Sequence, residues 1–97
     1  MRKERRDANE ADIIAALREA GCEVWQLCKD EPADLLVAAP AEFSYGHHNL
    51  SLLEVKDGSK PPSARKLTAK QVDTHKRWPV IVVEDVQQAL QAVRGGV

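Results

Sequence analysis

The chain has 97 residues, of which 43% are hydrophobic and 30% are charged, and its net charge is −1. These values are typical of a globular protein and exclude a disordered or fibrous chain. The near-neutral charge also excludes a simple polycation that coats nucleic acid by charge alone. A chain of this length can form one modest hydrophobic core. We therefore expect a single domain over residues 1–97, in which residues 1–8 are a flexible basic segment.

The cysteine content and the short apolar runs favour a soluble protein of a reducing compartment. Cys22 and Cys28 are too few for a disulfide scaffold and lack the companions of a zinc site. The basic start is not followed by the apolar segment of a signal peptide. The longest apolar run, residues 35–39, is far shorter than the roughly 20 residues that cross a bilayer. We expect a soluble, cytoplasmic protein with no membrane partner.

The first half of the chain is predicted to contain one helix and three strands. Apolar residues recur at helical spacing over 9–20, where Asp7 or Asn9 can cap the start and Gly21 the end. Short apolar runs bounded by turn residues predict three strands: residues 22–27, 34–38 and 49–56. The strand over 34–38 is expected to be buried on both faces, and a loop is expected over 40–48.

The second half is predicted to contain two helices and one strand. The prolines within residues 60–63 indicate a stiff connector. Two capping patterns then predict helix starts: Thr68 with Gln71, and Asp85 with Gln88. The two helices are expected to run to about residues 78 and 93, and the β-branched run 80–83 between them predicts a strand.

The predicted elements follow the order α-β-β-β-α-β-α, which indicates an α/β fold with a mixed four-stranded sheet flanked by helices. Short connections join the first three strands, so we expect an antiparallel meander. The fourth strand follows a helix and should therefore run parallel to its neighbour. Trp25 and Trp78 are expected in the core.

The third strand carries an acid and a base side by side. At a period of two residues, Glu54 and Lys56 share one face with Leu50 and Leu52. Taken alone, this pattern is explained by a surface ion pair at the end of a strand, which contributes at most about 1 kcal/mol.

Asp34 strengthens a functional interpretation of this pair. It opens the second strand, next to the third strand of the meander, where an ionised group needs a partner or a metal. Asp34, Glu54 and the backbone carbonyl of Val55 offer hard oxygen ligands suited to Mg²⁺ or Mn²⁺. The simpler alternative is that Asp34 caps the turn before its strand.

Glu10 is a third acid in an unusual place. It points between Ile14 and Leu17, within the apolar stripe of the first helix, so it is expected to approach the sheet. The alternative is that an acid in the first turn of a helix is favoured by the helix dipole.

Asp34, nineteen intervening residues and then Glu54-Val55-Lys56, within this element order, resemble the PD-(D/E)XK nuclease superfamily. The resemblance extends to its small phage-type VRR-NUC and Holliday-junction-resolvase-like branches. It also includes Glu10 on the first helix and Gln71 on the helix after the third strand, and it covers about residues 9–93. The family usually has a proline directly before the aspartate, whereas here one residue separates Pro32 from Asp34.

The resemblance implies a restriction-endonuclease-like αβββαβ core and metal-dependent hydrolysis of phosphodiester bonds, with no organic cofactor. Asp34, Glu54 and the Val55 carbonyl would hold Mg²⁺ or Mn²⁺. Glu10 would bind or orient a second ion or a water molecule. Lys56 would position the attacking water or offset developing negative charge. Gln71 would contact Lys56, a water or the phosphate, unless its amide serves only the capping box.

Charge placement favours a polyanionic partner more than the total charge does. Residues 56–77 contain seven basic and two acidic side chains, and four further basic residues lie within 2–6. Clustered cations beside an acid cluster suit phosphate binding around a metal. The predicted phosphate-binding residues are Lys60, Ser63, Arg65, Lys66 and Lys70.

The sequence therefore predicts a minimal nuclease domain: a Mg²⁺- or Mn²⁺-dependent DNA endonuclease, of phage or bacterial type, that can prefer branched or junction DNA. A homodimer is expected because a domain of this length needs two copies to span a duplex. One alternative is a non-catalytic nucleic-acid-binding or regulatory module on the same fold. Another is a structural partner protein whose charges form surface ion pairs.

Overall fold

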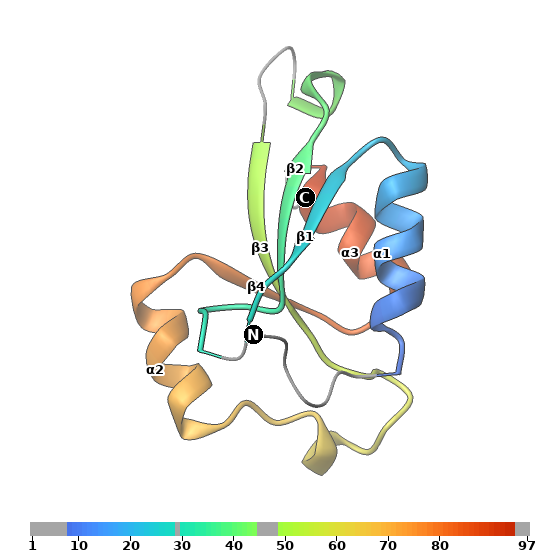
Figure 1. Ribbon diagram of the computed structural model, residues 1–97. Coiled ribbons are helices and arrows are strands. Elements are labelled where there is room, and N and C mark those ends of the chain that lie inside the picture. Colours follow the sequence, from blue (N-terminus) through green and yellow to red (C-terminus); the bar gives the residue numbers. More distant parts are fainter. Residues whose placement is uncertain (1–7, 29, 45–48, 95–97) are drawn as a thin grey trace.

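The computed structural model describes residues 8–28, 30–44 and 49–94 (Figure 1). Two 3₁₀ turns lie in the predicted loop and connector, at Ala41–Ser44 and Pro62–Ala64. The helices and strands follow the predicted order: α1 (Glu10–Glu19), β1 (Glu23–Gln26), β2 (Leu35–Ala39), β3 (Asn49–Val55), α2 (Ala69–Arg77), β4 (Val80–Val83) and α3 (Val86–Val93). The predicted basic segment and Asp7 lie outside the described residues, apart from Ala8.

The four strands form one mixed sheet in the order β1-β2-β3-β4. The first three pair antiparallel and β4 pairs parallel with β3, which confirms the predicted α/β topology. One row of paired positions crosses the whole sheet: Trp25, Leu36, Leu52 and Val80. A second row, which includes Leu35 and Leu53, points to the opposite face because side chains alternate along a strand.

Both amphipathic helices cover the same face of this sheet. α1 and α3 pack against each other and against the strands, and they lie together on one side of the sheet in Figure 1. The core between them and the sheet is aliphatic, and its largest fully buried side chains include Ile13, Leu17, Leu35, Leu53 and Val93. α2 lies on the other side in that view and buries none of its residues.

We call the face of the sheet opposite α1 and α3 the open face. Two predictions about the residues on it are wrong. Trp25 and Trp78 are 73% and 49% exposed and do not belong to the core. In β2, Leu35 is buried but Leu36 is partly exposed, so the strand is not buried on both faces. The physical reason is that both apolar helices occupy one side, whereas α2 covers the other side at its Glu54 end, through Gln71, and leaves Trp25 and Leu50 exposed.

The helix ends follow the predicted capping patterns with one exception. Thr68 and Gln71 form the complete capping box of α2, and the Asp85 side chain accepts from the Gln88 backbone N–H at the start of α3. Gly21 follows α1 with a φ of 99°, which favours glycine. Asn9 occupies the N-cap position of α1 but its side chain makes no capping bond. No helix within the described ranges is long and apolar enough to cross a membrane.

Candidate functional site

Asp34 and Glu54 are neighbours on adjacent strands. The Asp34 backbone N–H donates to the Leu53 carbonyl at 3.0 Å, and Asp34 Oδ2 accepts from the Val55 backbone N–H at 2.8 Å. Because Leu35 pairs with Leu53, Asp34 lies opposite Glu54 in the same register. Both acids are buried, at 6% and 4% exposure. The Asp34 side chain thus reaches across to β3, while the alternative interpretation assigned it to its own turn.

Gln71 connects Glu54 to Lys56. Its side-chain Nε2 donates to Glu54 Oε2 at 2.9 Å, and its Oε1 accepts from Lys56 Nζ at 3.1 Å. The same Oε1 accepts from the Thr68 backbone N–H at 2.9 Å, which closes the capping box. The two roles that the sequence left as alternatives for Gln71 are therefore both present in one side chain.

Lys56 places a positive charge beside the acids. Its Nζ lies 3.9 Å from Glu54 Oε2, and both side chains are largely buried. A cation at this distance favours the ionised carboxylate and reduces the repulsion between two neighbouring acids. The three side chains of Asp34, Glu54 and Lys56 together carry one net negative charge when ionised.

His75 lies near this group, one helical turn after Gln71. Burial, and secondarily the positive charge of Lys56, lower the pKa of His75 below its ordinary value. Its Nε2 is buried and has no hydrogen-bond partner within the described part of the chain. The sequence signal for His75 was its spacing of four residues from Gln71, which places both on one helix face.

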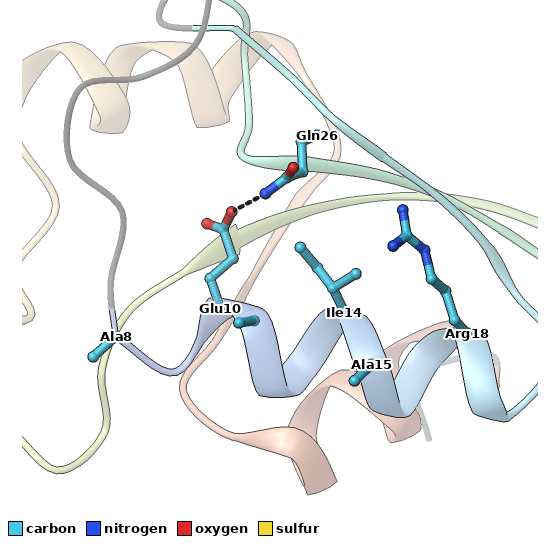
Figure 2. A pocket seen from close by; sticks show the side chains of 7 residues that line it. Ala8, Glu10, Ile14, Ala15, Arg18 and Gln26 are labelled. Atoms are coloured by element: carbon cyan, nitrogen blue, oxygen red, sulfur yellow. Dashed lines mark hydrogen bonds between the residues drawn. The ribbon is translucent and has the colours of Figure 1, made fainter.

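Glu10 is buried on the other side of the sheet. Its Oε2 accepts from Gln26 Nε2 at 3.1 Å, and the two side chains point toward each other in Figure 2. They line a hollow of about 400 Å³ together with Ile14 and Arg18. Glu10 therefore approaches the sheet, as expected, but from the face covered by α1.

The structure does not gather the three predicted acids into one cluster. Among residues 8–28, 30–44 and 49–94, no group of three or more His, Cys, Asp or Glu side chains is placed to hold a metal ion. Asp34 and Glu54 come together, with Asp34 bonded to the Val55 N–H, whereas Glu10 bonds to Gln26 on the face covered by α1. The metal-binding role of Glu10 stays a prediction.

The predicted phosphate-binding residues differ in their exposure and in their ion-pair partners. Lys60, Ser63 and Lys66 are exposed along the segment between β3 and α2. Arg65 is partly buried and its Nη1 lies 2.9 Å from Glu84 Oε2, which fixes this segment to the end of β4. Lys70 Nζ lies 3.6 Å from Asp30 Oδ1, and both side chains are highly exposed. An exposed pair of this kind contributes little and leaves the lysine available to a phosphate.

Asn9 supports the site in a way that sequence reasoning missed. Its Nδ2 donates to the Lys56 carbonyl at 3.2 Å and to the Glu84 carbonyl at 2.9 Å. It thereby joins the start of α1 to the ends of β3 and β4. An asparagine directly before a helix normally caps that helix. The sequence therefore predicted a capping bond for Asn9 and gave no sign of its bonds to Lys56 and Glu84.

Comparisons with models of protein families, with curated proteins and with solved structures found no match to this chain.

Proposed function

We propose that this protein is a Mg²⁺- or Mn²⁺-dependent DNA endonuclease of the PD-(D/E)XK type. The observation that carries the proposal is the bond from the Val55 N–H to Asp34, which sets Asp34 opposite Glu54 on the neighbouring strand. Lys56 and Gln71 both lie against Glu54, and Gln71 contacts Lys56, which is one of the contacts that the resemblance implies for it. Residues far apart in the sequence thus supply two acids, a base and an amide to one place.

The donor set fits a hard divalent cation. Asp34 and Glu54 offer carboxylate oxygens, and Val55, whose N–H bonds to Asp34, follows Glu54 directly and adds its backbone carbonyl, so these three groups would hold the ion. Their neighbourhood carries a net negative charge even with Lys56 included. When bound, the ion would lower the pKa of a water and offset negative charge on the phosphoryl oxygens.

The chain's own side chains would orient the reacting groups. Gln71 holds both Glu54 and Lys56 in fixed positions, so neither needs to reorganise when substrate arrives. The Lys56 ammonium would donate a hydrogen bond to the attacking water or to the charge that develops on the phosphate. Lys60, Ser63 and Lys66 would contact the DNA backbone and fix its register.

Cleavage assays on the full chain test this proposal. Supercoiled, linear and branched DNA are incubated with Mg²⁺ or Mn²⁺ and the wild-type protein, Glu54→Gln or Lys56→Ala. We expect cleavage by wild type and a loss of at least about a hundredfold in each variant. The matched control, Glu19→Gln, changes an exposed residue of α1 and should cleave like wild type. The proposal is wrong if no substrate is cut, or if all variants cut equally.

A non-catalytic nucleic-acid-binding module is the second candidate. One observation favours it: Glu54 already has Gln71 and Lys56 as partners, so this buried acid is stabilised without a metal. DNA binding that persists in the presence of a chelator, together with no cleavage of any substrate, would support this candidate against the first.

A further inference from the structure

The proposed site and an apolar groove lie on the same open face of the sheet. Glu54 and Leu52 both project from this face of β3, because side chains alternate along a strand. Asp34 lies opposite Glu54, and Leu36 lies opposite Leu52. Two residues of a strand span about 7 Å, so the apolar side chains begin directly beside the two acids. A substrate that extends along the strands from the acids therefore contacts an apolar surface.

The groove has a volume of about 900 Å³ and is lined mainly by three parts of the chain. They are the connection between β1 and β2, the middle of the sheet, and the segment where α2 ends and β4 begins. Most of the lining is apolar, and it includes Leu27, Pro32, Leu36, Leu52, Trp78 and Val80. Sites for small organic groups have volumes of about 300–1,000 Å³. The groove is therefore large enough to hold one.

One side of α2 leads from the acids to Trp78. Gln71 bonds to Glu54 in the first turn of this helix, and Trp78 is the C-cap residue. Their spacing of seven residues places both side chains on the same side of the helix. The seven residues span about 10 Å, whereas stacked nucleotides advance about 3.4 Å each. The indole ring, which is 49% exposed, therefore lies within a few nucleotides of the acids.

The chemistry of the groove suits bases better than phosphates. Among the described residues that line it, the one charged side chain is Glu31, whose Oε1 accepts from the Cys28 backbone N–H at 2.8 Å. A duplex carries its phosphates on the outside and its stacked base faces inside, so it would present phosphates to a surface without cations. An unpaired strand can instead turn its bases toward aromatic and apolar side chains and stack on them.

A protein partner suits this groove less well than the substrate does. A protein layer that filled the groove would also cover Asp34 and Glu54, because they lie on the same face about 7 Å away. DNA that is bound at the acids reaches the groove without a second partner. The position of the groove therefore favours a role in substrate binding.

We propose that the groove binds unpaired bases beside the scissile phosphate, with one base stacked on Trp78. The proposal rests on the proposed nuclease function and names its substrate class, which is DNA that is single-stranded on the groove side of the cut. A single strand, a flap or a loop meets this requirement. A continuous duplex and a four-way junction in which every base is paired do not, because their base faces are already stacked.

Binding of oligonucleotides to the full chain, with a chelator present to prevent cleavage, tests the groove. A labelled single strand and the duplex of the same sequence are compared by fluorescence anisotropy. We expect the single strand to bind more tightly, and Trp78→Ala to raise its dissociation constant by about 5- to 150-fold. Trp78→Phe keeps an aromatic face and should retain most of the affinity.

Trp25→Ala is the matched control for Trp78→Ala. Trp25 is a tryptophan on the same face with 73% exposure, but it does not line the groove. This variant should bind the single strand like wild type, and circular dichroism and thermal unfolding verify that all variants are folded. A single strand that binds no more tightly than the duplex would overturn the proposal. Equal losses of affinity in Trp78→Ala and Trp25→Ala would also overturn it.

The emission of Trp78 reports on stacking directly. The chain has two tryptophans, so Trp25→Phe leaves Trp78 as the sole tryptophan. A stacked base should quench its emission as the single strand is added, whereas the duplex should leave the emission unchanged. Emission that stays unquenched at saturation with the single strand would argue decisively against a base on Trp78.

Cleavage in Mn²⁺ separates this proposal from the nuclease function. Wild type should cut a single strand and a flap, and it should leave a fully paired four-way junction intact. Equal cleavage of paired and unpaired DNA would overturn the stacking groove but keep the nuclease. Cleavage of no substrate, together with the expected binding and quenching, would contradict the nuclease function and support the groove as a site for unpaired bases.

Discussion

The side chains of Gln71 and Glu54 are joined by a 2.9 Å hydrogen bond between the first turn of α2 and the end of β3. The amide that donates this bond also accepts from the Thr68 backbone and so begins the helix. The geometry of the acid and the stability of the helix start therefore depend on the same side chain.

Gln71→Glu should separate these two roles. Glutamate at this position still completes a capping box, but it replaces the donor to Glu54 with a second negative charge. We expect the helix to remain and metal-dependent cleavage to fall by roughly a hundredfold, because a small misplacement of a reacting group costs about that much. Gln71→Ala should lower both activity and thermal stability. Equal activity of Gln71→Glu and wild type would contradict a positioning role for Gln71.

Two substitutions of Asp34 should differ in stability while sharing a loss of metal binding. Asp34→Asn keeps an oxygen that accepts from the Val55 N–H, whereas Asp34→Ala leaves this buried donor unpaired, at a cost of about 1–3 kcal/mol. Denaturant unfolding measures that difference. Titration with Mn²⁺ should show both variants weakened by more than the roughly tenfold that an outer-shell substitution costs. Wild-type Mn²⁺ affinity in Asp34→Asn would argue against Asp34 as a ligand.

Asp85→Ala should lower stability without touching the site. The Asp85 carboxylate accepts from the Gln88 N–H at 2.8 Å and caps α3, which supplies part of the core. Loss of an N-cap typically costs about 1 kcal/mol. Thermal unfolding should show the decrease, while cleavage per folded molecule stays constant. Asp73→Ala, which removes an exposed pair with Arg77, is the control and should change stability by less.

His75 should make the protein less stable in mild acid. Its folded-state pKa is lowered by burial and by Lys56, so the unfolded chain binds the proton more readily. The neutral imidazole contributes fully to the free energy of unfolding at pH values above its ordinary pKa of 6.5. It is lost as the pH falls below that value, until His75 is protonated in the folded state too. His75→Gln should flatten this part of the stability-against-pH curve. An unchanged slope would show that another group causes it.

Periodicity and capping chemistry were sufficient to predict the elements and much of the site. Alternation along β3 placed Glu54 beside Lys56, and the short connection to β2 brought Asp34 next to them. These features are local patterns or pairings between consecutive strands, so they depend little on contacts between segments that are far apart in the sequence. The capping box of Thr68 and Gln71 was predictable for the same reason.

The covering of the sheet could not be predicted in this way. Trp25 and Leu36 have the hydrophobicity of core residues, but their burial depends on which face α1 and α3 occupy. That choice is made by tertiary packing and leaves no periodic signal in the strands themselves. Glu10 shows the same limit, because helical spacing predicts that it approaches the sheet but does not give its distance from Asp34 and Glu54.

The two bonds of the Asn9 amide span 47 and 75 residues of the chain. Contacts over such separations close large loops, and here they bring the start of the described chain to its middle and to its last strand. The Lys56 carbonyl is held by this amide and the Lys56 N–H by the Val83 carbonyl, so the position of Lys56 depends on both the first helix and the last strand. Loss of either contact would leave this end of β3 held on one side alone.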